Sequence, residues 1–340
     1  MVNPKTIKDM KKNFIGIDVS KKTLDIAIYS TNGNERANHL VIENNREGFK
    51  KMISWIKEKK IALKELLICM EHTGVYANEI VNFLEKKGIT YCRLSALAIK
   101  KSGGIIRGER DKEAAFRISR YAYEKREQLS PSKLPSKTII ALKDLLTERK
   151  GYVNSIIQYK QRKSEIAVCQ GENSIKRKDE VITMLNNKIE EVKIEIMELI
   201  ENDSELLKTY NLISSVIGIG FVNAVSFIAY TNNFQDFTNP RSYACYISVA
   251  PFPHASGTSI NKRTSISKIG RLKLKAELTM AARSAVINDP ELNRYFKRKF
   301  NGKKGPESNY GQVLNAIKFK LICRVFAVVK RQEKYVVFQF

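Results

Sequence analysis

The sequence predicts an α/β N-terminal domain, a pair of long helices that form a coiled coil, and a mostly α-helical C-terminal domain. Three observations favour this order. Short apolar runs alternate with helical patterns up to residue 129, a Pro- and Ser-rich stretch follows, and apolar residues then recur at a spacing of three and four. We therefore expect domains at residues 1–129, 130–209 and 210–340.

The N-terminal domain is expected to contain a mixed sheet with helices packed on it. Turn chemistry at residues 32–34 separates two of three early strand-like runs, which indicates a meander. After the meander, apolar strands alternate with amphipathic helical patterns, which favours helix-covered strands. The expected strands are residues 14–19, 24–29, 39–42, 66–70 and 89–94, and the expected helices are residues 46–59, 74–87 and 111–123.

The central region has the apolar spacing of two long helices joined near residues 171–174. The first series is interrupted by Arg149 and Lys163, whereas the second is continuous. An antiparallel coiled coil is expected, and it either joins protomers or packs only within one chain. The two series are Leu142, Leu145, Tyr152, Ile156, Tyr159 and Ile166, and then Ile182, Leu185, Ile189, Val192, Ile196 and Leu199.

The C-terminal region has two features that favour contact with phosphates. Gly218 and Gly220 stand where one helix is expected to turn into another, and glycine amides can approach a phosphate closely. Six basic residues and no acid lie between residues 261 and 275. We expect phosphate contacts from this run, the alternative being a solvated face. The expected contacts are Lys262, Arg263, Lys268 and Arg271.

Composition indicates a folded chain with a polyanionic partner. Hydrophobic residues make up 43% of the 340 positions, enough for each domain to bury a core. Lysine and arginine number 60 against 35 aspartates and glutamates, so the formal net charge is +25. This excess disfavours a small neutral substrate as the whole function and makes nucleic acid the first partner to consider.

Metal binding by cysteine, membrane insertion and export are not expected. The five cysteines are scattered without a zinc-site pattern, and their odd number argues against a disulfide framework. No apolar stretch reaches the roughly 18 residues of a membrane span. The N-terminus lacks the apolar core of a signal peptide. The sequence therefore predicts a cytoplasmic protein without a membrane partner.

Three acids stand where a sheet of this kind would bring them together. Asp18 interrupts an apolar strand, Glu71 ends another, and Asp111 opens a helix. A carboxylate in an apolar strand is costly unless it is paired or binds a cation. Two strand acids and one helix acid are what an RNase H-type sheet uses to hold Mg²⁺. Helix capping or ion pairing by these acids is the alternative.

Five segments in this order resemble the DEDD transposases named after insertion sequence 110, which are kin of the pilin-gene DNA invertases. The resemblance runs from about residue 14 to about residue 290. The resemblance is specific because five segments occur together in one chain, whereas any one of them alone would be a weak signal. They are residues 16–25 (GIDVSKKTLD), 70–76 (MEHTGVY), 107–118 (RGERDKEAAFRI), 218–220 (GIG), and 256–257 (SG) with 266–270 (ISKIG).

The resemblance implies a RuvC-like RNase H fold, a coiled coil and a C-terminal transposase domain with a serine nucleophile. Asp18, Glu71 and Asp111 match the first three acids of the metal-binding quartet, and Ser256 matches the serine. It further implies Mg²⁺ as cofactor, a bridge RNA as guide, and target and donor double-stranded DNA as partners. The implied assembly is a homo-oligomer, a dimer that assembles to a tetramer.

The chain departs from the family pattern at the fourth acid. The pattern is Asp-Lys-x-Asp-Ala, and residues 111–115 place Ala114 at the position of the second Asp. An engineered substitution and a natural loss with Glu113 as partial stand-in both explain this. Three functions stay open: a bridge-RNA-guided recombinase that acts through a phosphoserine, an unguided DNA invertase, and a nucleic-acid-binding relative with impaired catalysis.

Overall fold

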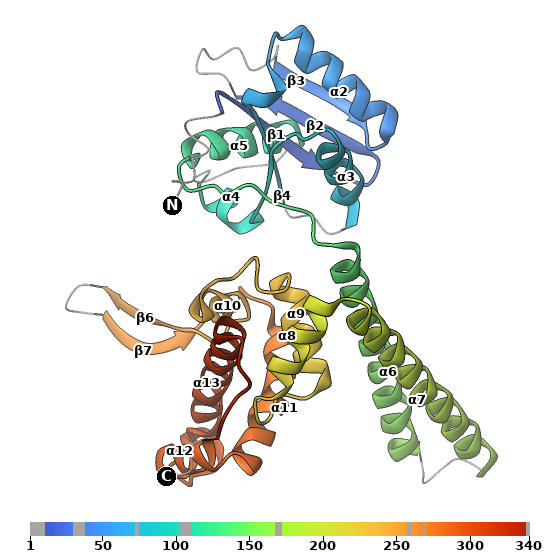
Figure 1. The fold of residues 1–340 in the computed structure, drawn as a ribbon, viewed down its shortest axis with the longest axis vertical. Helices are drawn as coiled ribbons and strands as arrows, with labels where there is room; N and C mark the ends of the chain where they lie inside the picture. Colours follow the sequence, from blue (N-terminus) through green and yellow to red (C-terminus); the bar gives the residue numbers. More distant parts are fainter. Residues whose placement is uncertain are drawn as a thin grey trace. The chain divides into compact units, whose positions relative to one another are not determined.

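The structure is a computed structural model that describes residues 11–29, 38–71, 75–102, 111–166, 172–256, 260–267 and 269–337. Side chains at residues 163–166, 253–256 and 260–263 lie outside the description. The chain divides into two compact units, Met1–Leu134 and Pro135–Phe340. Each unit is described by itself (Figure 1).

The first unit contains a five-stranded mixed sheet in the order β3-β2-β1-β4-β5. Neighbouring strands β1, β2 and β3 are antiparallel, whereas β4 runs parallel to β1 and β5 runs parallel to β4. The predicted meander and mixed sheet are therefore confirmed. The strands are β1 (Asn13–Val19), β2 (Thr23–Ile28), β3 (His39–Glu43), β4 (Leu66–Glu71) and β5 (Tyr91–Leu94).

Alternation along the strands gives the sheet two apolar faces. Ile15 and Ile17 point to the face that α2 and α3 cover, and Phe14 points to the face that α4 and α5 cover. Figure 1 shows these helices on the sheet. The helices of this unit are α2 (Arg46–Glu58), η2 (Leu63–Glu65), η3 (Val75–Ala77), α3 (Asn78–Lys86), α4 (Ala96–Ser102) and α5 (Asp111–Glu124).

Helix α5 lies directly on β1 because residue 16 has no side chain. A Cβ atom at Gly16 would overlap the carbonyl oxygen of Ala115 and the amide nitrogen of Ser119. Both are backbone atoms of α5, so the helix cannot yield by a change of rotamer. Gly16 thus fixes how α5 lies along the central strand, and with it the position of the helix's first residue, Asp111.

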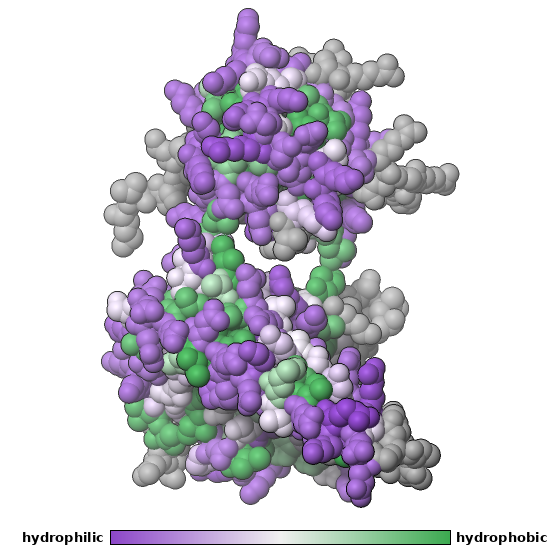
Figure 2. Space-filling model, turned by 90° about the vertical axis from the view of Figure 1, so that its right-hand side faces the viewer, coloured by the Kyte–Doolittle hydropathy of each residue, from purple (hydrophilic) through white to green (hydrophobic). Residues whose placement is uncertain are grey.

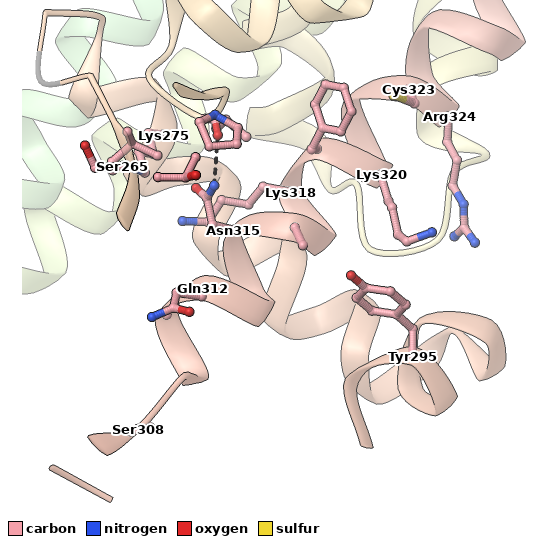
Figure 3. A pocket seen from close by; sticks show the side chains of 17 residues that line it. Ser265, Lys275, Tyr295, Ser308, Gln312, Asn315, Lys318, Lys320, Cys323 and Arg324 are labelled. Carbon is pink, nitrogen blue, oxygen red and sulfur yellow. Dashed lines mark hydrogen bonds between the residues drawn. The ribbon is translucent and has the colours of Figure 1, made fainter. Parts of the chain in front are cut away.

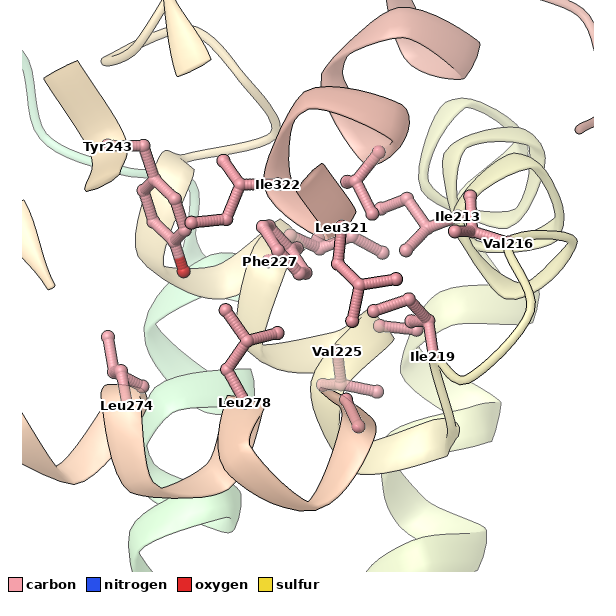
Figure 4. Packing of buried hydrophobic residues seen from close by; sticks show 14 of the residues in the cluster. Ile213, Val216, Ile219, Val225, Phe227, Tyr243, Leu274, Leu278, Leu321 and Ile322 are labelled. Carbon is pink, nitrogen blue, oxygen red and sulfur yellow. The ribbon is translucent and has the colours of Figure 1, made fainter. Parts of the chain in front are cut away.

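The second unit is mostly helical, as predicted, with one β-hairpin. Leu321 and Ile322 of α13 lie among buried side chains of α8, α9 and α11, as Figure 4 shows. The elements are α6 (Lys137–Ile166), α7 (Glu172–Glu201), α8 (Ser204–Ser214), α9 (Phe221–Thr231), α10 (Pro240–Tyr246), β6 (Pro251–Ser256), β7 (Ile260–Ile266), α11 (Leu272–Asn288), α12 (Pro290–Lys299), η4 (Gly305–Glu307) and α13 (Tyr310–Arg331).

The two long helices, α6 and α7, pack against each other within the chain (Figure 1). Ile182, Leu185 and Ile189 of α7 form a buried cluster with Ile156 of α6. The end of α7 near Ile196 belongs to the core of the C-terminal helices. The apolar seam is therefore covered inside one chain, and its role between protomers stays a prediction, as do the boundaries at residues 129 and 209.

The surface of the described chain is mostly hydrophilic. Figure 2 shows hydrophilic side chains over most of its visible face. Large exposed apolar side chains occur on α11, where Met280 and Ile287 are 62% and 76% exposed. Among the helices that the structure describes, none is long and apolar enough to cross a membrane.

Gly16→Ala is expected to lower the free energy of unfolding of the first unit by about 3 kcal/mol, the upper end of the usual range for overpacking, because backbone atoms cannot move aside. Denaturant unfolding followed by circular dichroism would measure the change. Gly151→Ala in α6 is the control, since no atom lies within 4 Å of its added Cβ and alanine favours a helix by up to about 1 kcal/mol. Equal stability of the Gly16 variant and the wild type would contradict the packing argument.

Candidate functional site

The first two acids end neighbouring strands of the sheet. Ile17 pairs with Met70 between the parallel strands β1 and β4, so Asp18 and Glu71 occupy the next step of the same ladder. Side chains at matching positions of adjacent strands point to the same face. Both acids are half-buried. The sheet register therefore places the two carboxylates side by side, as the sequence predicted.

The third acid, Asp111, begins α5, the helix that Gly16 holds against β1. Gly16 and Asp18 are two residues apart on β1, so both positions face the same side of the sheet. That side is the one that α5 covers, and Asp18 therefore faces α5. The pKa of Asp18 is raised to about 6, first by burial and then by the negative charges of Asp111, Glu71 and Asp25. The structure thus brings the three predicted acids into one electrostatic cluster.

A further acid, Asp25, belongs to this cluster, and sequence reasoning missed it. Asp25 lies directly opposite Asp18 in the β1–β2 ladder. Its Oδ1 lies 2.9 Å from Nε2 of His39, whose ring lies 6.1 Å from that of Phe116 on α5. Asp25 interrupts an apolar strand just as Asp18 does. The rule that singled out Asp18 would therefore have found it.

The position of the expected fourth acid faces inward on α5. Ala114 is 8% exposed and lies three residues after Asp111, on a neighbouring part of the helix surface. Glu113 is exposed, and it lies about 200° around the helix from Asp111. The carboxylate of Glu113 thus does not share the face that carries Asp111, and the partial stand-in role gains no support.

The donor atoms of the cluster suit a hard divalent cation. Asp18, Glu71 and Asp111 supply carboxylate oxygens, the ligands that Mg²⁺ prefers, and their mutual repulsion favours a cation among them. Within the described ranges, however, no three His, Cys, Asp or Glu side chains are arranged to hold a metal ion as they stand. The ligand chemistry therefore fits, while the side-chain geometry is not that of a closed metal site.

The proposed serine stands on the hairpin of the second unit. Ser256 ends β6 and pairs with Ile260 of β7, and an irregularity of register lies between Phe252 and His254. Lys262 and Arg263 stand on β7. The structure describes the backbone at these positions, while the side chains of Ser256, Lys262 and Arg263 lie outside the described part, and Lys268 lies outside it altogether.

The two glycines of the second unit have different local roles. Gly218 has φ +93°, and a Cβ there would lie 2.6 Å from Cβ of Ala285, so close packing on α11 explains this glycine. Gly220 is the N-cap of α9, and no atom lies within 4 Å of a Cβ built on it. Packing therefore requires glycine at position 218 and does not require it at position 220. A phosphate contact stays a prediction for both glycines.

Arg271, the last predicted phosphate contact, precedes α11 and stacks on two aromatic rings. Its guanidinium carbon lies 5.7 Å from the ring centroid of Tyr230 and 5.5 Å from that of Tyr246. Its backbone amide donates to the carbonyl of Tyr246 at 2.9 Å. These contacts hold the arginine close to the root of the hairpin, where its exposed surface can meet a phosphate.

Comparison with known proteins identifies both units. Residues 15–166 match a transposase family of the DEDD type, and residues 210–297 match the transposase IS116/IS110/IS902 family. Two similar relatives are the pilin gene-inverting proteins of Moraxella bovis and Moraxella lacunata. Each is 26% identical over 333 residues, which cover 96% of this chain and 98% of the relative. The chain therefore belongs to the IS110 family of transposases and is a DNA transposase or recombinase.

Proposed function

We propose that this enzyme is a bridge-RNA-guided DNA recombinase of a mobile element, which cleaves and exchanges strands in a Mg²⁺-dependent reaction through a phosphoserine. The observation that carries the proposal is the cluster around Asp18, where burial and three further acids raise the pKa of one carboxyl to about 6. Carboxylates crowded in this way repel a phosphodiester unless a cation lies between them.

The acids of the first unit have the role of metal ligands in this proposal. Asp18, Glu71 and Asp111 would hold Mg²⁺, which when bound offsets the negative charge of the phosphodiester. Asp25 positions Asp18 rather than binding the ion, because its Oδ1 is already 2.9 Å from Nε2 of His39. The RuvC-like reading of this unit rests on its mixed sheet with α5 packed across β1.

Ser256 has the role of nucleophile. Its Oγ would form a bond to phosphorus while the bond between phosphorus and one strand oxygen breaks, so the energy of the phosphodiester is kept for rejoining. A serine hydroxyl is a weak nucleophile at its ordinary pKa. Lys262, Arg263, Lys268 and Arg271 would stabilise the charge that develops on the phosphate.

The guide RNA and the assembly are inferred from charge and from the family resemblance. The net charge of +25 fits a chain that holds RNA as well as target and donor DNA. We infer a dimer that assembles to a tetramer, joined through the region of α6 and α7, where Ile157 and Met184 are 48% and 53% exposed.

An unguided DNA invertase is the second candidate. The similarity to proteins described as pilin gene-inverting favours it, because it extends over 96% of the chain. A relative with impaired catalysis is the third candidate, and the methyl group at Ala114 favours it. The guided recombinase and the unguided invertase differ in whether a specific RNA stays bound to the purified protein. The relative with impaired catalysis differs from both in how strand cleavage responds to an aspartate at position 114.

Purification of the chain from its host cells is expected to yield one structured RNA in a defined ratio to protein, because a guide remains bound where non-specific RNA is removed by moderate salt. Sequencing of the bound nucleic acid would identify it. A heterogeneous mixture of fragments, all released by the same salt, would favour the unguided invertase.

Asp18→Asn is expected to raise the melting temperature of the first unit above pH 6, because the amide has no charge to bury or to repel. The pKa of Asp18 is raised to about 6 from its ordinary 3.8, so the native state is destabilised where the group is ionised. The gain should therefore be full above about pH 6 and vanish as the pH falls toward 3.8. Thermal melting across this range would measure it.

Millimolar Mg²⁺ should stabilise the wild type at neutral pH and stabilise the Asp18→Asn variant less, since a ligand and a charge are missing. Glu58→Gln, at an exposed position on α2, is the control and should change neither response. If Asp18→Asn raised the melting temperature by the same amount at every pH, the charge of Asp18 would not be what destabilises the first unit.

Ala114→Asp is expected to increase Mg²⁺-dependent strand cleavage in the presence of cognate RNA and DNA, because a fourth carboxylate would complete the ligand set. In that background, Ser256→Ala should abolish the covalent protein–DNA adduct and leave RNA binding largely intact, because the hydroxyl contributes little to electrostatic affinity. Denaturing gels of end-labelled DNA would reveal the adduct. Its persistence without the hydroxyl would rule out the serine mechanism.

A further inference from the structure

A large cavity of about 1060 Å³ lies in the second unit at the root of the β6–β7 hairpin (Figure 3). Its walls come from α11, α12 and α13, from the segment before β6 and from the end of β7. Among the described residues that line it there is no aspartate or glutamate. Four basic side chains do line it, namely Lys275, Lys318, Lys320 and Arg324.

Two of these basic residues already have partners. Arg324 donates to Oδ2 of Asp289 and to Oε2 of Glu291, each at 2.6 Å. The ammonium group of Lys320 lies 4.8 Å from the ring centroid of Tyr295. The positive charge that remains available inside the cavity is therefore that of Lys275 and Lys318.

Lys318 is a buried cation without a counterion. The residue is 6% exposed, its ammonium group makes no hydrogen bond or ion pair with any residue that the structure describes, and the side chain lines the cavity. Burial first, and then the positive charges of Lys275 and Arg283, lower its pKa to about 8. A buried cation in this state is costly unless an anion from outside the chain pairs with it.

Lys275 lies close enough to Lys318 for its charge to act on it. No acid in the described part of the chain forms an ion pair with Lys275 either. Its Nζ donates to the backbone carbonyl of Ser248 at 3.0 Å, just before the hairpin. Glu277, two residues further along α11, forms an ion pair with Lys150 at 2.8 Å. The cavity thus contains a pair of lysines from two helices, and the nearby acids on α11 and α12 are used elsewhere.

Asn315 stands in the wall of the cavity with its amide group held in place. Its Nδ2 donates to the carbonyl of Val249 at 2.8 Å, which fixes the amide, while its buried Oδ1 accepts no hydrogen bond from the described residues. Ala316 and Phe319 on the same helix give the cavity an apolar wall. A ligand that matches the two lysines and the apolar wall carries an anion and an apolar face.

We propose that this cavity binds one nucleotide of a nucleic-acid strand, with its phosphate on Lys275 and Lys318 and its sugar and base against Phe319 and Asn315. A nucleotide combines the required anion and apolar face, which inorganic phosphate does not. The cavity adjoins the root of the hairpin whose strand β6 ends at Ser256, so a strand anchored here can continue along that hairpin. The inference rests on the proposed function only for the identity of this strand.

Cys323 lines the cavity and provides a direct test in the unmodified protein. Burial raises the pKa of its thiol, so alkylation by N-ethylmaleimide is measured at about pH 8. Saturation with a DNA or RNA strand of about twelve nucleotides should slow alkylation of Cys323 about fivefold or more. Cys245, which does not line the cavity, is the internal reference, and peptide mass spectrometry separates the two.

Lys318→Met tests the charge. Methionine fills similar space and removes an uncompensated cation, so the melting temperature should stay equal or rise. Affinity for the strand should fall about tenfold, with a salt slope smaller by about one. Lys330→Met, at an exposed position on the same helix, removes the same charge and should change affinity less than about twofold.

Three results would overturn the proposal. They are unchanged reactivity of Cys323 at saturating strand, equal losses of affinity in the two lysine variants, and full protection of Cys323 by inorganic phosphate at matched ionic strength. Stronger protection by DNA would identify a substrate strand, and stronger protection by RNA a guide strand, and either supports a nucleotide site. No cleavage is needed, so a failure of the serine mechanism would leave this test unaffected.

Discussion

The contact between the backbone of α5 and Gly16 is the constraint on which the acid cluster of the first unit depends. With no side chain at residue 16, the helix lies against the central strand, and any larger residue would overlap Ala115 and Ser119. This contact fixes where the helix begins relative to the end of β1. It therefore places the charge of Asp111 within reach of Asp18, and the same close approach removes water from Asp18 and raises its pKa to about 6.

Repulsion within the acid cluster and affinity for a cation are two consequences of one arrangement. Carboxylates on adjacent strands cannot separate without breaking the ladder between β1 and β4. Asp25 pairs with His39 at 2.9 Å, and its negative charge still contributes to the raised pKa of Asp18. A cation among the remaining acids would relieve both the repulsion and the cost of burial, so binding and stability are linked.

In the second unit, helix α13 contributes side chains to both the core and the cavity. Leu321 and Ile322 pack against α8, α9 and α11, whereas Asn315 and Lys318 line the cavity. The rigidity of the core therefore fixes the positions of the amide and the ammonium group. Gly218 lies in the connection between α8 and α9 and packs closely on α11, the helix that carries Lys275. This packing also helps to fix the position of Lys275.

The sequence by itself determined the elements, the mixed sheet and three acids of the cluster, because strand and helix periodicity and a charge in an apolar run are local signals. Asp25 was within reach of the same rule. Tertiary structure alone decided that the seam of α7 is covered by α6, that Ala114 of α5 is buried, and that Lys318 is buried without a counterion among the described residues. Lys318 looks like any lysine of an amphipathic helix, since burial depends on segments distant in sequence that only folding brings together.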